Sequence, residues 1–277
     1  MVDRGVGFPV VLIPGLQGRW EWMEPTVEAL KAGHRVITFS LQELRPKIER
    51  DGVFQAWTRA LDRVLDQARE RQVSLIGVSF GGPIAARYAA RRPDRVTSLI
   101  LASAPPPRWR LRPDDQFCIS HPLLALPYFG ARGLFRLTPE IMRARQSWGQ
   151  RCQLGVEHAR RVFKSPSDPR LMAQWMREWA AYDTADDFDR ITAPTLVITG
   201  ESNLDRVVPV HDSKKYLELI PGATHKVLHD TGHLGSITKP HRFAEIAGHF
   251  IYNTHAAART PATDDPAGAA ARRQHAS

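Results

Sequence analysis

Short, mostly apolar runs alternate with amphipathic segments along the first part of the chain. The runs are rich in β-branched residues, which is typical of buried strands. They cover Phe8–Ile13, Arg35–Phe39, Val73–Ile76 and Val96–Leu101. Between them, apolar residues recur every three or four positions, which predicts helices over Glu24–Ala32, Phe54–Glu70 and Gly82–Ala90. Alternating strands and helices predict a parallel sheet with helices on both faces.

This alternation stops between Arg108 and Arg190, where the pattern is helical or loop-like. Helices are predicted there over Gly133–Ser147, Gln150–Lys164 and Asp168–Tyr182, with Asp168 as a cap. The alternation resumes with strands at 194–200 and 225–228 and helices at 210–219 and 240–252. From Thr254 onward there is no periodicity. We therefore expect a core of residues 1–107 and 191–254, an inserted helical block at 108–190, and a disordered tail at 255–277.

The composition is that of an ordinary globular protein, with 277 residues, 43% hydrophobic and 24% charged. Its two cysteines, Cys118 and Cys152, form no C-x-x-C pair and fit a reducing compartment. The first residues lack the shape of a signal peptide, and no apolar stretch approaches the ~18 residues of a spanning helix. These features predict a soluble cytoplasmic protein without stable membrane insertion.

The formal net charge of +9 raises the question of an anionic partner. Most arginines are mixed with acidic residues, as in Arg59, Asp62, Arg63 and Asp66, which is typical of a solvated helix face. The densest basic patch, at 108–112, has no nucleic-acid-binding motif beside it, so we predict no nucleic-acid partner. An anionic lipid surface or an acidic substrate remains an open alternative. No nucleotide-binding glycine motif occurs, and we predict no cofactor.

A candidate nucleophile lies in the sequence Gly77-Val78-Ser79-Phe80-Gly81, between a predicted strand and a predicted helix. This is the G-x-S-x-G pattern of a nucleophile elbow. The sharp turn leaves no room for side chains at 77 and 81, and it presents the serine hydroxyl at the positive end of the following helix. The alternative at this point is a glycine-rich turn with an incidental serine.

A serine nucleophile needs a base and an acid that orients the base, and both should follow it at the carboxyl ends of later strands. Asp205 and His233 meet this demand and lie 28 residues apart. Glu201 is the alternative acid, and Asp230 is expected to fix a turn. His225, His229 and His233 are spaced by four, but a strand and a turn separate them, so we predict no metal site.

Four landmarks in order resemble the α/β-hydrolase superfamily over roughly residues 8–252: Pro14-Gly15-Leu16-Gln17-Gly18, the elbow at 77–81, Asp205 with Val208-Pro209, and Gly232-His233. The resemblance implies a serine hydrolase with Ser79 as nucleophile, His233 as base and Asp205 as orienting acid. It also implies an oxyanion hole made by the backbone N–H groups of Leu16 and Phe80, and it makes the inserted block a helical cap.

The chain departs from that family's pattern at two places. The loop after the first strand begins Pro14-Gly15 where the family usually has His-Gly, which leaves the backbone donors in place. The two leading antiparallel strands are largely missing, so we expect a mostly parallel sheet of about six strands. Apolar residues of the block could line a substrate pocket or form the block's own core: Phe117, Leu124, Tyr128, Phe129, Trp175 and Trp179.

These observations predict a serine hydrolase that cleaves carboxylic esters of small apolar acyl substrates. Hydrolysis of C–C bonds, thioesters or lactones, or cofactor-free perhydrolysis, are alternatives in the same site. A ligand-binding receptor or scaffold that retains the fold with little turnover is the alternative of a different class. The sequence leaves the oligomeric state open.

Overall fold

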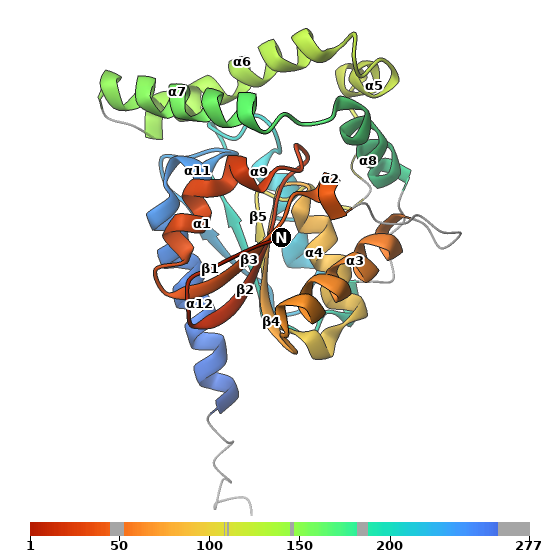
Figure 1. Cartoon of the computed structure of the whole chain (residues 1–277), viewed down its shortest axis with the longest axis vertical. Coiled ribbons are helices and arrows are strands. Elements are labelled where there is room, and N and C mark those ends of the chain that lie inside the picture. Colours follow the sequence, from red (N-terminus) through yellow and green to blue (C-terminus); the bar gives the residue numbers. More distant parts are fainter. Residues whose placement is uncertain (45–52, 108, 110, 145–146, 182–187, 260–277) are drawn as a thin grey trace, which may run out of the picture.

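A seven-stranded sheet forms the centre of the molecule in the computed structural model, which describes residues 1–44, 53–107, 109, 111–144, 147–181 and 188–259 (Figure 1). The strand order is β1-β3-β2-β4-β5-β6-β7. The strands are β1 Val2–Arg4, β2 Phe8–Ile13, β3 His34–Thr38, β4 Val73–Val78, β5 Val96–Ala102, β6 Thr195–Thr199 and β7 Thr224–Val227. All pairings are parallel except that of β1 with β3. The predicted α/β architecture is confirmed.

The strand count differs from the predicted six because β1 extends the sheet by one antiparallel strand. Its three residues pair with β3, from Val2 opposite Thr38 to Arg4 opposite Val36. Arg35 strengthens this edge, because its guanidinium donates to the Asp3 carboxylate at 2.6 Å. This strand is too short and polar to contain an apolar run, so it could not be predicted from the sequence pattern and is recognised by its pairing with β3.

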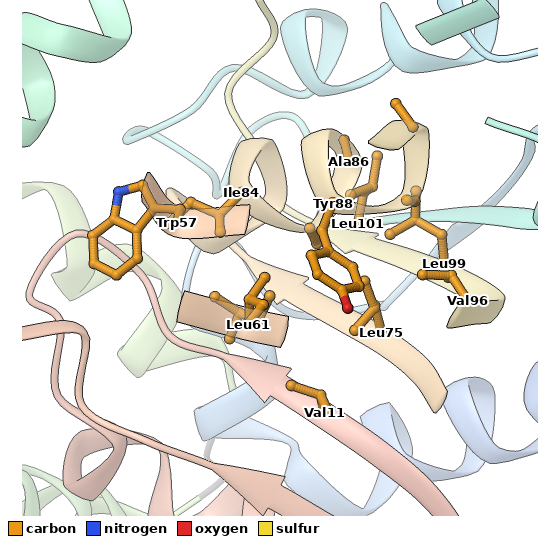
Figure 2. Close-up of a cluster of buried hydrophobic side chains, with 14 of the residues drawn as sticks. Val11, Trp57, Leu61, Leu75, Ile84, Ala86, Tyr88, Val96, Leu99 and Leu101 are labelled. Carbon is orange, nitrogen blue, oxygen red and sulfur yellow. The ribbon is translucent and has the colours of Figure 1, made fainter. Parts of the chain in front are cut away.

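Helices cover both faces of the sheet, and the alternation of side chains along the strands separates two cores. On one face, Val11 and Leu75 pack with side chains from α3 (Val53–Ala68) and α4 (Gly81–Arg91), which Figure 2 shows in close-up. On the other face, Val10 and Ile76 pack with side chains from α1 (Glu24–Leu30) and α12 (Pro240–Arg259). Both faces of the sheet are thus covered by helices.

Among the described residues between β5 and β6 there are four α-helices and a short 3₁₀ helix at Phe188–Arg190, and Figure 1 shows the four α-helices at one end of the sheet. They are α5 Pro113–Ser120, α6 Leu126–Ala144, α7 Trp148–Lys164 and α8 Pro169–Ala181. The pattern predicted α7 and α8 closely, and the Asp168 carboxylate caps α8 by accepting the Arg170 N–H at 2.8 Å. It missed α5, whose start is fixed by Pro113 and by the Asp115 carboxylate, which accepts the Arg112 N–H at 3.2 Å. It also placed the start of α6 seven residues too late.

Two differences concern the C-terminal third of the chain. The helix predicted over 210–219 is two short helices, α9 (Val210–Ser213) and α10 (Tyr216–Leu219). Helix α12 continues to Arg259, so residues 255–259, expected in the tail, are helical. Residues 260–277 lie outside the described part. Within the described ranges, no helix is both long and apolar enough to cross a membrane.

Candidate active site

Ser79 lies in a tight turn between β4 and α4, with the unusual backbone angle φ of 51°. A side chain at either flanking glycine would collide with backbone: a Cβ on Gly77 would lie 2.5 Å from the Gly81 carbonyl oxygen, and one on Gly81 would lie 2.3 Å from that of Ile13. The turn is held by the Ser79 N–H, which donates to the Ala102 carbonyl at 2.8 Å. A left-handed backbone at a non-glycine residue is uncommon, and it is found more often than average at functional turns.

His233 reaches Ser79 from the loop that follows β7. Its Nε2 lies 3.0 Å from the Ser79 Oγ, although the two residues are 154 positions apart. The loop approaches the Asp205 loop so closely that a Cβ on Gly232 would lie 2.5 Å from the Leu204 carbonyl oxygen. Glycine at 232 therefore permits the close approach of the two loops, which places the His233 imidazole next to Asp205.

Asp205 contacts the other nitrogen of the same imidazole. Its Oδ2 lies 3.4 Å from His233 Nδ1, while its Oδ1 accepts the N–H groups of Val207 and Val208 at 3.1 and 3.0 Å. The Asp205 and His233 side chains are only 1% and 10% exposed. A carboxylate held by two backbone donors in this way orients the ring without moving itself.

The pKa of His233 is raised. Burial of the imidazole acts to lower it, but the charge and hydrogen bond of Asp205 and the charge of Glu140 outweigh that effect. The chain of hydroxyl, imidazole and carboxylate can therefore remove the hydroxyl proton and stabilise the resulting imidazolium.

The alternative acid, Glu201, has other partners. Its Oε1 accepts the Asp230 N–H at 3.0 Å and lies 3.4 Å from the exposed His229 imidazole. Asp230 has a φ of 55°, and its side chain pairs with Lys239 at 2.8 Å and with Arg143 of α6 at 3.1 Å. Both acidic residues thus organise the turn before His233. Among the described residues, no group of three or more His, Cys, Asp or Glu could hold a metal ion.

The two predicted oxyanion donors lie beside the elbow. The loop after β2 turns through a bond from the Gly18 N–H to the Gly15 carbonyl at 2.8 Å, and a Cβ on Gly15 would lie 3.3 Å from the Ser79 Cβ. Within the described part of the chain, the N–H groups of Leu16 and Phe80 donate to no protein acceptor outside regular elements. Neither N–H group is therefore committed to one of these backbone bonds, and Pro14 removes neither.

The six predicted pocket residues fall into two groups. Trp175 and Trp179 are buried, and the Trp175 ring stacks on Phe80 with centroids 6.3 Å apart, directly against the elbow. The other four, Phe117, Leu124, Tyr128 and Phe129, lie on α5, on α6 and in the loop between them. Leu124 is 74% exposed. Trp175 therefore lies against the predicted site, and a pocket role for the other five residues stays a prediction.

Sequence reasoning missed Glu140, a fully buried carboxylate of α6. Its Oε2 accepts the N–H of Leu234, next to His233, at 2.8 Å, and its Oε1 accepts the Thr238 hydroxyl at 3.1 Å. Burial raises the pKa of the Glu140 carboxyl, and the N–H donors of Leu234 and Gly232 oppose the rise. A single glutamate in an amphipathic helix carries no signal of this contact, because its partners are 94 and 98 positions away.

Comparison with known proteins identifies the family and supports the fold. The model of the alpha/beta hydrolase family matches residues 10–246. A poly(3-hydroxyalkanoate) depolymerase of Ectopseudomonas oleovorans is 25% identical over 88% of this chain and 84% of its own. A pimeloyl-[acyl-carrier protein] methyl ester esterase of Aliivibrio salmonicida is 27% identical over 90% of this chain and 96% of its own. The structure of an esterase from Exiguobacterium antarcticum superposes with a TM-score of 0.71 at 21% identity, covering 91% of this chain and 94% of that one.

Proposed function

The chain belongs to the alpha/beta hydrolase family, and we propose that this hydrolase cleaves carboxylic esters with Ser79 as nucleophile, His233 as base and Asp205 as orienting acid. The observation that carries the proposal is the 3.0 Å contact between His233 Nε2 and Ser79 Oγ, with Asp205 on the opposite ring nitrogen. The names of relatives that include a methyl ester esterase support the bond type.

The proposed reaction has two halves. Ser79 Oγ attacks the ester carbonyl carbon while His233 takes its proton, and the N–H groups of Leu16 and Phe80 stabilise the oxyanion. The intermediate collapses, His233 gives the proton to the leaving alcohol, and an acyl-enzyme on Ser79 remains. Water then attacks the acyl-enzyme with His233 again as base, which releases the acid and restores the serine.

The α5–α8 segment is proposed to act as the cap that holds the substrate. Trp175 of α8 lies against Phe80 and beside Gly18, where a Cβ would come within 2.9 Å of the indole, so the segment contacts both oxyanion loops. An aromatic surface at this point favours an uncharged, apolar acyl group. We therefore propose small apolar acyl esters as the substrate class.

Covalent labelling tests the proposal directly. An active-site fluorophosphonate should modify Ser79 stoichiometrically, because only a serine deprotonated by a neighbouring imidazole attacks such a phosphorus centre at neutral pH. Intact-protein and peptide mass spectrometry locate the adduct. A panel of esters, thioesters and lactones of varied chain length, assayed alongside, should show preference for apolar esters. An unlabelled Ser79 in folded protein would instead identify a non-catalytic scaffold.

Glu140→Gln should lower kcat by roughly 5- to 30-fold with little change in KM. The amide keeps the size of the carboxylate but replaces charge-assisted hydrogen bonds with neutral ones, a loss of about 1–2 kcal/mol at the loop that holds His233. KM should hold because Glu140 contacts the His233 loop rather than the ester. Steady-state kinetics on purified protein measure both constants.

The same variant should move the acid limb of the pH profile of kcat/KM to lower pH. The Glu140 charge contributes to the raised pKa of His233, together with the closer Asp205, and the reaction needs the neutral imidazole. Removing that charge lowers the pKa, so activity survives to lower pH. Glu157→Gln, which changes an exposed carboxylate on α7, is the matched control. Equal profiles for both variants would show that Glu140 only supports the fold.

A further inference from the structure

Exposed apolar side chains are concentrated on the helices between β5 and β6. Among the described residues, fourteen large apolar side chains are exposed, and eleven of them lie between Phe117 and Phe163. The most exposed of these eleven are Phe163 at 87%, Leu124 at 74% and Phe135 at 72%. Such a concentration of exposed apolar side chains on one segment favours an interaction site over single residues scattered across the surface.

On α7 the apolar residues form one stripe that faces away from the protein. Trp148, Val156 and Phe163 are 67%, 69% and 87% exposed, and at 3.6 residues per turn they fall within an arc of about 80°. The opposite side of the helix makes the contacts with the core. There the His158 ring meets Trp22 edge-on at 5.5 Å, and Arg161 Nε lies 3.2 Å from a Glu24 carboxylate oxygen. The stripe is therefore not the face that packs on the core.

Helix α6 also has apolar side chains on the side that faces away from the core. Glu140 defines its inner face, because the carboxylate is bonded to the loop that carries His233. Leu134, Phe135 and Met142 lie on the opposite side and are 69%, 72% and 39% exposed. Both helices thus turn apolar side chains outward, in the opposite sense to a helix that covers a core.

The basic residues on these two helices indicate which kind of partner the outward faces bind. Helices α6 and α7 contain seven arginine or lysine residues and two glutamates, one of which is the buried Glu140. Three of the seven pair with acidic residues outside these helices: Arg132, Arg143 and Arg161. Arg160 and Lys164 are exposed and lie on one flank of the α7 stripe, about 40° and 80° from its edge on the helical projection. A helix with aromatic residues on one face and basic residues beside them lies in the interface of an anionic bilayer, its rings at the acyl boundary and its cations at the phosphates.

We propose that the outward faces of α6 and α7 dock on an anionic phospholipid surface, without any segment crossing it. Self-association through the same face fits less well, since the basic residues beside the stripe would find only Glu157 as an exposed acidic group on these two helices. The inner faces would keep their contacts with the His233 loop and with Trp22. Lipid binding is independent of the proposed catalysis, because no proposed catalytic residue takes part.

Vesicle flotation tests the proposal with the full chain. The protein should float with vesicles of phosphatidylcholine plus phosphatidylglycerol, and not with phosphatidylcholine alone. Binding should weaken in about 1 M salt, where the screening length is about 3 Å. Ser79→Ala protein should bind equally well, which separates docking from turnover. Equal flotation with neutral and anionic vesicles would overturn the charge argument.

Two variants locate the surface. The triple variant Phe135→Ser, Trp148→Ser, Phe163→Ser should lose at least about 100-fold in affinity for the anionic vesicles, whereas Tyr252→Ser, which removes an exposed aromatic from α12, should keep it.

A second variant tests the charges. Arg160→Glu with Lys164→Glu should lower the affinity for the anionic vesicles by at least about 30-fold. The control Lys214→Glu with Lys226→Glu, which changes two lysines outside α6 and α7, should lower it far less. Circular dichroism confirms folding. A wild-type dimer that the triple variant abolishes, with no lipid binding in either, would assign the face to a second copy instead.

Discussion

Ser79→Ala should reduce kcat for ester hydrolysis by roughly 10⁴- to 10⁶-fold while leaving the protein folded. The hydroxyl is the only atom of the proposed site that forms a bond to the substrate, so its removal forces water to attack without an acyl-enzyme. Substrate binding should survive, since the oxyanion donors of Leu16 and Phe80 belong to the backbone. Single-turnover and steady-state assays measure the loss, and calorimetric binding of a non-hydrolysable analogue shows retained affinity.

Ser103→Ala is the matched control for this variant. Ser103 follows β5 as Ser79 follows β4, it also has a left-handed backbone with φ of 44°, and it is 6% exposed. The backbone conformation is therefore comparable, although Ser103 is buried and Ser79 is half-buried, and Ser103 forms no hydrogen bond to His233 within the described residues. This control should stay within about threefold of wild type. Turnover by Ser79→Ala at the wild-type rate would remove Ser79 from the mechanism.

The proximity of Ser79, Asp205 and His233 was predictable because each lies in a local sequence pattern, and the parallel sheet brings the three loops together. The elbow at 77–81, the Asp205 loop and the His233 loop each follow a parallel strand, and such ends meet at one edge of a sheet. Apolar runs and glycines can be recognised in the sequence without knowledge of the residues that they contact in the fold. Together they suffice to place the three side chains within contact of one another.

Features that depend on distant partners could not be predicted in the same way. Strand β1 is defined by its pairing with β3. Glu140 contacts the candidate site through its hydrogen bond with the N–H of Leu234, 94 positions away. The outward faces of α6 and α7 are a third case. Periodicity predicts that a helix has an apolar face, but it does not say whether that face meets the core or the solvent.

Asp205→Asn should reduce kcat by up to about 10⁴-fold, the second largest effect expected for the chain. The amide oxygen can still accept the N–H groups of Val207 and Val208, so the loop should keep its shape. The amide nitrogen, however, would face His233 Nδ1 as a donor. That favours the ring tautomer whose Nε2 carries the proton and cannot accept one from Ser79.

The same change removes the main charge that raises the pKa of His233, so burial should then lower it, and the acid limb of the residual activity should move to lower pH. Glu201→Gln is the informative control, because Glu201 is the other acidic side chain near the end of β6, and its partners are Asp230 and His229. It should cost less than about tenfold, with an unshifted profile. The reverse ranking of the two variants would transfer the orienting role from Asp205 to Glu201, and proton NMR of the imidazole in each variant would show which carboxylate the ring donates to.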